Sequence, residues 1–249
     1  MIPFRKPLLT LATALGMVFV GGCDGSASPL TRSGMASPMR YDEEPTKVKL
    51  RDMYMVIPAN CFDSPLEAEG PSENGYFVTG GVYLVMLYPK LECRNHKNRL
   101  FFSKTGPYRP SMGMLVSSMG PGRDVKDAFD AIFRIETTER IGRQTPVSLI
   151  SRSDAEEIYV MQARTGLAES KFTIYKSIED NAFTVCRLPP PPQIPGCSLR
   201  FIYGTKHVSV GFGGSFAGLR KTIKDSVTRK LDGFRRFPNG HISDRAPAP

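Results

Sequence analysis

The sequence predicts a mostly β domain of the α+β class, in which an antiparallel sheet or sandwich is covered by a C-terminal amphipathic helix. Short apolar and alternating runs recur between turn-forming Gly, Pro and Asn residues, as in β-rich domains. The clearest helical periodicity lies near the end of the chain. Strands do not alternate with helices, which disfavours a parallel nucleotide-binding sheet.

The N-terminus is typical of a bacterial lipoprotein. Arg5 and Lys6 precede an apolar run, 7–20, which is shorter than the roughly 20 residues that a spanning helix needs. Cys23 follows an apolar residue and two glycines, the cleavage pattern of a lipoprotein leader. We predict that residues 1–22 are a signal peptide and that Cys23 becomes the acylated first residue. An ordinary secretory leader with a chance cysteine is the alternative, but it leaves the position of Cys23 unexplained.

This leader places the mature protein on the periplasmic side of the cell envelope, anchored by acyl chains such as palmitate. Residues 23–46 are rich in Gly, Ser and Pro and predict a flexible tether. Asp24 resembles the enterobacterial signal for retention in the inner membrane, although the leaflet stays open. The net charge of +9 favours an acidic partner surface or anionic lipid, or serves solubility alone. Nucleic acid is not an expected partner outside the cytoplasm.

Residues 47–236 are predicted to form one β-rich domain, followed by a disordered tail, 237–249. The expected strands share β-branched, aromatic or alternating apolar residues and lie at 47–57, 76–78, 81–88, 100–102, 112–117, 157–161, 171–175, 183–186, 197–203 and 207–212. Residues 81–88 are apolar on both faces, which predicts a central strand.

Two segments have helical character. Residues 124–133 predict a short helix with Phe129, Ile132 and Phe133 on one face. The C-terminal helix has an apolar stripe with Ser215 as its expected N-cap. The stripe consists of Phe216, Leu219, Ile223, Val227, Leu231 and Phe234. It predicts docking on the core, and the alternative is a membrane-surface helix, because basic residues cover the other faces.

Four cysteines remain after acylation of Cys23, and in an exported protein they predict disulfides. Three pairings are possible. Cys186 and Cys197 flank a proline-rich loop between two expected strands, so a bridge across its mouth is reasonable, which leaves Cys61 with Cys93. No CxxC pair is present, which disfavours a thiol oxidoreductase or a zinc ribbon.

Catalytic and metal-binding motifs are weak. His96, His207 and His241 form no HxH or HxxxH pair, so no metal site is predicted. Ser215 lies between an expected strand and a helix, as in a hydrolase nucleophile elbow. Ala217 stands where that motif needs glycine, so we interpret the segment as a capped turn.

An acidic cluster near the start of the domain could bind calcium or cleave glycosides, but it lies in a Pro/Gly loop without EF-hand spacing. It consists of Asp63, Glu67, Glu69 and Glu73. We interpret it as a solvated loop. The residues therefore favour a binding protein over an enzyme, without metal or cofactor.

Three stretches together resemble a known family: 54–60, 81–89, and 185–197 with the strand and terminal amphipathic helix that follow. Their order is similar to that in small proteobacterial lipoproteins encoded beside type VI secretion lipase effectors. The resemblance covers 47–236 and implies an immunity protein that binds and blocks a toxic phospholipase in the periplasm. Cys61 stands where that family has an aromatic residue, a departure that a Cys61–Cys93 bridge would explain.

The resemblance carries over no functional residue, so the effector-binding surface is unassigned. The exposed loops 187–195 and 97–110 are unranked candidates. The alternatives are a structural or assembly lipoprotein of an envelope complex and, third, an envelope enzyme that uses the Ser215 turn.

Overall fold

The computed structural model describes residues 44–63, 72–104, 109–119, 124–140, 147–165, 168–188 and 195–236. They all belong to the second of two compact units, Met1–Ala36 and Ser37–Pro249, and only that unit is described here. The signal peptide 1–22, Cys23, Asp24, the tether up to residue 43 and the tail 237–249 lie outside the described residues, so they stay predictions. No helix among the described residues has both the length and the apolar character to cross a bilayer.

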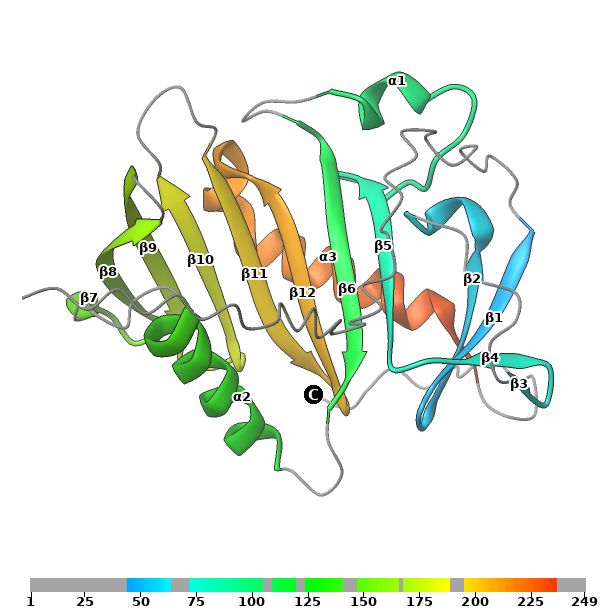
Figure 1. Ribbon diagram of the computed structural model, residues 1–249, viewed down its shortest axis with the longest axis horizontal. Helices are drawn as coiled ribbons and strands as arrows, with labels where there is room; N and C mark the ends of the chain where they lie inside the picture. The colour runs from blue at the N-terminus through cyan, green and yellow to red at the C-terminus, as the bar shows by residue number, and fades with distance from the viewer. Residues whose placement is uncertain are drawn as a thin grey trace, which may run out of the picture. The chain divides into compact units, whose positions relative to one another are not determined.

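The larger of two sheets has eight strands and is antiparallel throughout (Figure 1), in the order β5-β6-β12-β11-β10-β9-β8-β7. Its strands are β5 (Gly81–Leu87), β6 (Ser111–Ser118), β7 (Ser148–Arg152), β8 (Glu156–Thr165), β9 (Ala168–Ser177), β10 (Ala182–Leu188), β11 (Gly196–Tyr203) and β12 (Lys206–Gly213). The mostly β class predicted from the sequence is confirmed.

The smaller sheet has the order β13-β2-β1-β4-β3, and only its β1–β4 pair is parallel. Its strands are β1 (Pro45–Leu50), β2 (Met53–Pro58), β3 (Ser72–Glu73), β4 (Tyr76–Val78) and β13 (Arg235–Arg236). The short helix η1 (Ala59–Cys61) follows β2. Asp52, in the turn between β1 and β2, is ion-paired with the fully buried Lys206 of β12, which ties the two sheets together.

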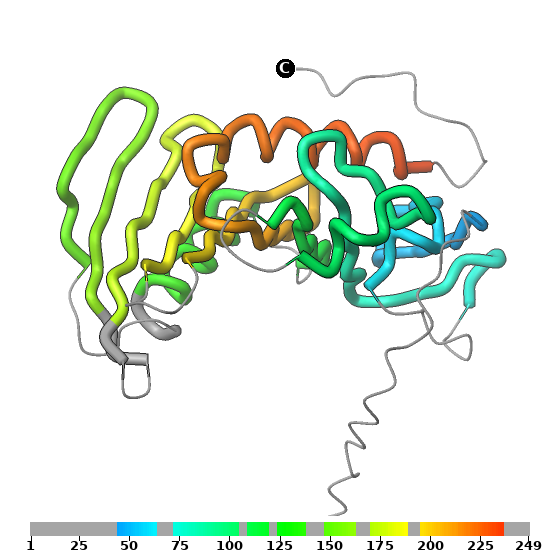
Figure 2. Tube along the Cα trace, turned by 90° about the horizontal axis from the view of Figure 1, so that it is seen from above, coloured from blue at the N-terminus to red at the C-terminus, as the bar shows by residue number. Residues whose placement is uncertain are grey.

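The C-terminal helix α3 (Arg220–Phe234) covers one face of the large sheet (Figures 1 and 2). Strand β11 alternates buried and half-buried residues, as expected for a strand with one face on the core. Its buried residues join those of α3, β12 and the small sheet in one hydrophobic cluster. Ile223, Val227 and Leu231 are at most 1% exposed. Docking on the core is therefore confirmed for this helix, and the membrane-surface alternative is wrong. Leu219, which the sequence places in the same stripe, is 42% exposed and does not dock.

The helix α2 (Val125–Arg134) packs on the opposite face of the large sheet and forms a second cluster. Asp124 caps it by accepting hydrogen bonds from the backbone N–H groups of residues 126 and 127. The rings of Phe129 and Phe133 lie 5.7 and 5.2 Å from that of Phe183, so the predicted apolar face is confirmed. A π-helical segment, η2 (Ile135–Arg140), extends this helix.

Several sequence predictions need correction. Residues 47–57 form the hairpin β1–β2 rather than one strand, because Arg51 adopts a left-handed conformation (φ 59°) and reverses the chain. Residues 81–88 form an edge strand of the large sheet, not a central one. Its apolar character arises because Leu84 and its alternate neighbours face the core, whereas Tyr83 is 48% exposed. Strands β3, β7 and β13 were not predicted.

Two further predictions fail for local reasons. Residues 100–102 belong to a helical turn, α1 (Arg99–Phe102), since a short apolar run does not distinguish helix from strand. Ser215 does not cap the C-terminal α-helix. It is exposed within a 3₁₀-helix, η3 (Gly214–Leu219), and α3 begins only at Arg220.

Candidate interaction surface

The structure does not gather the candidate catalytic and metal-ligating residues into a site. His207 lies in β12, His96 lies in the loop before α1, and His241 lies outside the described residues. Among the described residues, no group of three or more His, Cys, Asp or Glu side chains could hold a metal ion. Ser215, the candidate nucleophile, is exposed in η3.

The acidic cluster of the sequence is divided between two separate ion pairs. Asp63 is 3.0 Å from the guanidinium of Arg94, and Glu73 pairs with Lys49. Glu67 and Glu69 lie outside the described residues. Each described carboxylate is about half exposed and neutralises a basic side chain that is at most 14% exposed.

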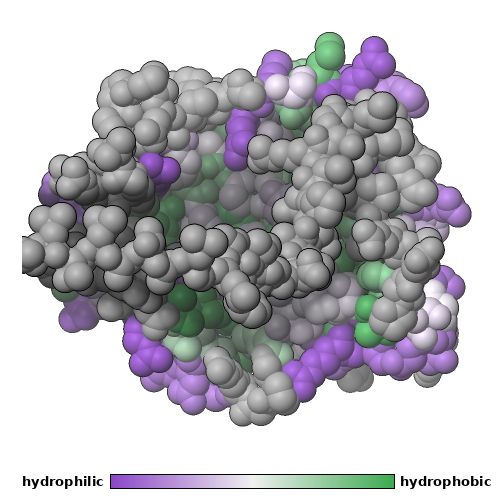
Figure 3. All heavy atoms as spheres, in the orientation of Figure 1, coloured by the Kyte–Doolittle hydropathy of each residue, from purple (hydrophilic) through white to green (hydrophobic). Residues whose placement is uncertain are grey.

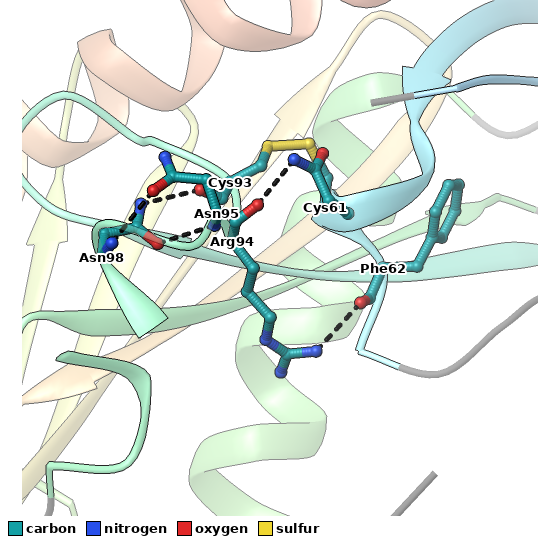
Figure 4. The surroundings of a disulfide bond; sticks show 7 residues. Cys61, Phe62, Cys93, Arg94, Asn95 and Asn98 are labelled. Carbon is teal, nitrogen blue, oxygen red and sulfur yellow. Dashed lines mark hydrogen bonds between the residues drawn. A yellow bond between two sulfur atoms is a disulfide. The ribbon is translucent and has the colours of Figure 1, made fainter. Parts of the chain in front are cut away.

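Both disulfides pair as the sequence favoured. Cys186 and Cys197 face each other across β10 and β11, at the mouth of the proline-rich loop. The candidate loop 187–195 itself is described only at residues 187, 188 and 195. Cys61 of η1 bonds to Cys93, which attaches the loop after β5 to the end of the first hairpin (Figure 4).

A network of hydrogen bonds fixes the conformation of the loop after β5. The side chain of Asn60 donates a hydrogen bond to the carbonyl of Arg94 at 2.6 Å. That of Asn98 donates to the carbonyl of Cys93 at 2.9 Å (Figure 4). The side-chain Oδ1 atoms of Asn95 and Asn98 also accept hydrogen bonds from backbone N–H groups of the same turn, with N···O distances of 2.8–2.9 Å. Because Asn98 is 7% exposed and its amide is paired, the turn that leads into α1 has a defined conformation.

This rigid turn presents apolar side chains to the outside. Leu100 is 69% exposed and Phe101 is 43% exposed, both within α1. In Figure 3, hydrophobic atoms protrude beside strongly hydrophilic ones at the top of the view, over the position of α1 in Figure 1. We define residues 90–104 as the basic loop. Its exposed cations are Lys90, Lys97, Arg99 and Lys104.

A pocket of about 370 Å³ lies behind the basic loop, lined by Leu87, Tyr88, Pro89, Lys90, Glu92, Asn98, Phe101, Lys104 and Pro110. The ammonium of Lys104 is 4.4 Å from the centre of the Phe101 ring, so a cation and an aromatic face form part of its rim. An exposed apolar surface with a pocket is typical of interaction sites rather than of scaffold.

A second exposed apolar surface lies at the far edge of the large sheet. All five residues of β7 are exposed, Leu149 at 47% and Ile150 at 61%. The strand pairs with β8 alone among the described strands, and its register shifts between Leu149 and Ser151, which leaves Ile150 unpaired in a bulge. The backbone of an open edge of this kind can pair with a strand of a partner protein, and its exposed apolar side chains can contact an apolar partner surface.

Two groups of charged residues serve the scaffold. Near the start of α3, Glu156 accepts hydrogen bonds from Arg220 at 2.6 and 3.0 Å, and Asp180 pairs with Lys224 at 2.9 Å. They line a pocket of about 350 Å³, whose cations are thus already partly neutralised. The guanidinium of Arg220 also lies 4.1 Å from the ring centre of Tyr175, so it braces α3 against β9.

A buried polar cluster under the π-helical segment was not recognisable from the sequence. Glu136 forms a 2.7 Å ion pair with Arg200 of β11, and both side chains are at most 14% exposed. His207, from the neighbouring β12, has its pKa lowered to about 4 by burial and by the positive charge of Arg200. No local motif could reveal this cluster, because Glu136 is distant in sequence from the β11–β12 hairpin that carries Arg200 and His207.

The sequence matches no protein-family model, and no curated protein is detectably similar to it. Two solved structures match this chain. One is the iron-regulated outer membrane lipoprotein FrpD of Neisseria meningitidis, with 13% identity, a TM-score of 0.48, and coverage of 80% of this chain and 96% of FrpD. The other is Smlt3025, an immunity protein of the Stenotrophomonas maltophilia type IV secretion system, with 16% identity and a TM-score of 0.53. That similarity covers 83% of this chain and 100% of Smlt3025, so the two proteins share a fold over the full length of Smlt3025.

Proposed function

We propose that this protein is a lipid-anchored immunity protein on the periplasmic side of the cell envelope, which binds a secreted toxin and blocks it. The observation that carries the proposal is the fold shared with Smlt3025, a secretion-system immunity protein, over all of that chain. The lipoprotein leader that ends before Cys23 supplies the location, because a toxin delivered to the envelope is met there. An immunity protein needs a rigid surface and no chemistry of its own.

We further propose that the toxin is a type VI phospholipase. This assignment rests on the resemblance of 54–60 and 81–89 to immunity lipoproteins encoded beside lipase effectors. Smlt3025 belongs to a type IV system, so its fold supports the immunity role and leaves the secretion system open. The identity of the effector encoded beside this gene therefore tests the assignment to a phospholipase.

Among the described surfaces, the edge strand β7 is the one that best suits a protein partner. Leu149 and Ile150 are large apolar side chains exposed on an open sheet edge. A toxin strand or apolar patch placed here would cover both side chains and the outward backbone groups of β7. A few residues that are fully desolvated at the centre of an interface contribute most of the affinity, and Leu149 and Ile150 are the residues of β7 that we expect to act in this way.

The test uses the lipase effector encoded beside the gene, directed to the periplasm together with the full-length protein. We expect wild-type protein to restore growth and to form a stoichiometric complex that inactivates the lipase. Ile150→Lys should weaken binding at least tenfold, because a charged side chain would be desolvated in an apolar contact. Leu219→Lys is the matched control, since Leu219 is 42% exposed on η3 and should change neither growth nor binding.

Three results would contradict parts of this proposal. A lipase that stays fully active when saturated with the protein excludes the immunity role. Recovery of membrane-complex subunits in place of the effector supports an assembly lipoprotein instead. Equal effects of the Ile150 and Leu219 variants would remove β7 as the binding surface while leaving the immunity role intact.

A further inference from the structure

We propose that the basic loop, residues 90–104, is a membrane-docking element that inserts Leu100 and Phe101 among anionic phospholipid headgroups. This goes beyond the proposed function, since it requires neither a toxin nor inhibition. It relies on the expected anchor at Cys23 only for keeping the domain near a membrane.

The first argument is the place of the loop relative to the start of the domain. Glu44 is the first described residue, and its carbonyl accepts a 2.9 Å hydrogen bond from the N–H of Ala59 in η1. Cys61, at the end of η1, bonds to Cys93. The chain therefore enters the domain beside the basic loop, and only 20 residues lie between Cys23 and Glu44. A short tether gives the loop a high effective concentration at any membrane that holds the anchor.

The second argument is the chemistry of the exposed side chains. Leu100 and Phe101 are 69% and 43% exposed, and the same loop carries exposed cations at positions 90, 97, 99 and 104. The ammonium of Lys104 lies 4.4 Å from the centre of the Phe101 ring. None of these four cations forms an ion pair with another described residue. Apolar tips between Lys and Arg side chains are the combination that places a segment at the interface of an anionic bilayer. One apolar anchor and a basic patch together also hold a protein more firmly than either alone.

The third argument is the rigidity of the loop. The disulfide and the side-chain hydrogen bonds of Asn60, Asn95 and Asn98 fix the turn before α1. Because the loop is already ordered, docking costs little conformational entropy. The opposite edge of the sheet, β7, is seven strand spacings from β5, which is roughly 34 Å at about 4.8 Å each. Docking through the basic loop thus leaves β7 free for a protein partner.

The experiment exploits the absence of Trp from the chain. Phe101→Trp places a single fluorophore at the apolar tip of the loop in the protein processed from the full-length gene. The protein is added to vesicles of phosphatidylethanolamine and phosphatidylglycerol, or of phosphatidylcholine alone, with and without brominated acyl chains. Ile178→Trp is the control, because Ile178 is 50% exposed in the turn after β9. Mass spectrometry reports acylation of Cys23 separately.

We expect the emission of Phe101→Trp to shift to shorter wavelength and to be quenched by brominated lipid in vesicles that contain phosphatidylglycerol. The shift should be lost with phosphatidylcholine and in a variant that adds Lys97→Glu and Arg99→Glu. Ile178→Trp should not respond. Leu100→Trp is a second reporter should Phe101→Trp fold poorly, as judged by circular dichroism.

Identical emission of Phe101→Trp in both kinds of vesicle overturns the proposal. So does a shift that occurs only on addition of the toxin, because the loop would then be a protein-binding surface. If the wild-type protein docks on the membrane but does not inhibit the toxin, the proposed function is refuted and the docking proposal is not. Failure of one proposal can therefore be distinguished from failure of the other.

Discussion

His207 should make the stability of the protein depend on pH in a window where few other side chains titrate. Its imidazole is mostly buried in β12, and its Nε2 atom has no hydrogen-bond partner among the described residues. Burial and the charge of Arg200 lower its pKa from 6.5 to about 4. The folded protein therefore keeps this side chain neutral at pH values where the unfolded chain protonates it.

The sign follows from proton binding. Between about pH 6.5 and 4 the unfolded chain binds one more proton at His207 than the folded protein does, so stability decreases as the pH falls through this window. The full contribution is present above pH 6.5. With these two pKa values, the loss between pH 7.5 and pH 5 is about 2 kcal/mol. The lowered pKa values of Asp52 and Glu157 act in the same direction, but mainly below pH 4.5.

Urea unfolding followed by circular dichroism at pH 7.5 and pH 5 measures this loss. His207→Phe keeps a planar ring but removes the titrating group, so the difference between the two pH values should shrink by about 2 kcal/mol. Ser117→Ala is the control, because Ser117 is the cross-strand neighbour of His207 in β6 and carries no titrating group. An unchanged pH dependence in His207→Phe would show that the imidazole is not held neutral by the fold.

Two further predictions concern the scaffold. Replacing Cys61 and Cys93 together with Ala should lower the free energy of unfolding by about 4 kcal/mol, against about 3 kcal/mol for Cys186 and Cys197, because the first pair closes a loop of 32 residues and the second one of 11. Urea unfolding of both variants checks the order, and a reversed order would contradict it. Leu231→Ala should cost about 2–5 kcal/mol, since Leu231 is fully buried, and an unchanged thermal midpoint would contradict the docking of α3 on the core.

Local sequence patterns predict the buried face of an element correctly where one side of that element packs against the core and the other faces solvent. The spacing of Ile223, Val227 and Leu231 predicted which face of α3 is buried, and Phe129 with Phe133 predicted the face of α2. The same patterns failed where two conformations share one pattern. The short apolar run at 100–102 forms the helical turn α1 because side chains from other positions, Asn60 and Asn98, fix the preceding turn.

The features of the candidate sites also divide into those that the sequence predicts and those that only the tertiary structure shows. The chain by itself predicted the cysteine pairs and the buried stripes, which the structure confirms, and the lipoprotein leader, which stays a prediction. Each of these is read from residue types and their spacing along the chain. Only the tertiary structure decided that β5 and β7 are the edges of one sheet, that Glu44 lies beside η1, and that Glu136 meets Arg200. Strand order and contacts between distant residues depend on how whole faces pack against each other, and side-chain periodicity specifies which face is buried without specifying its partner.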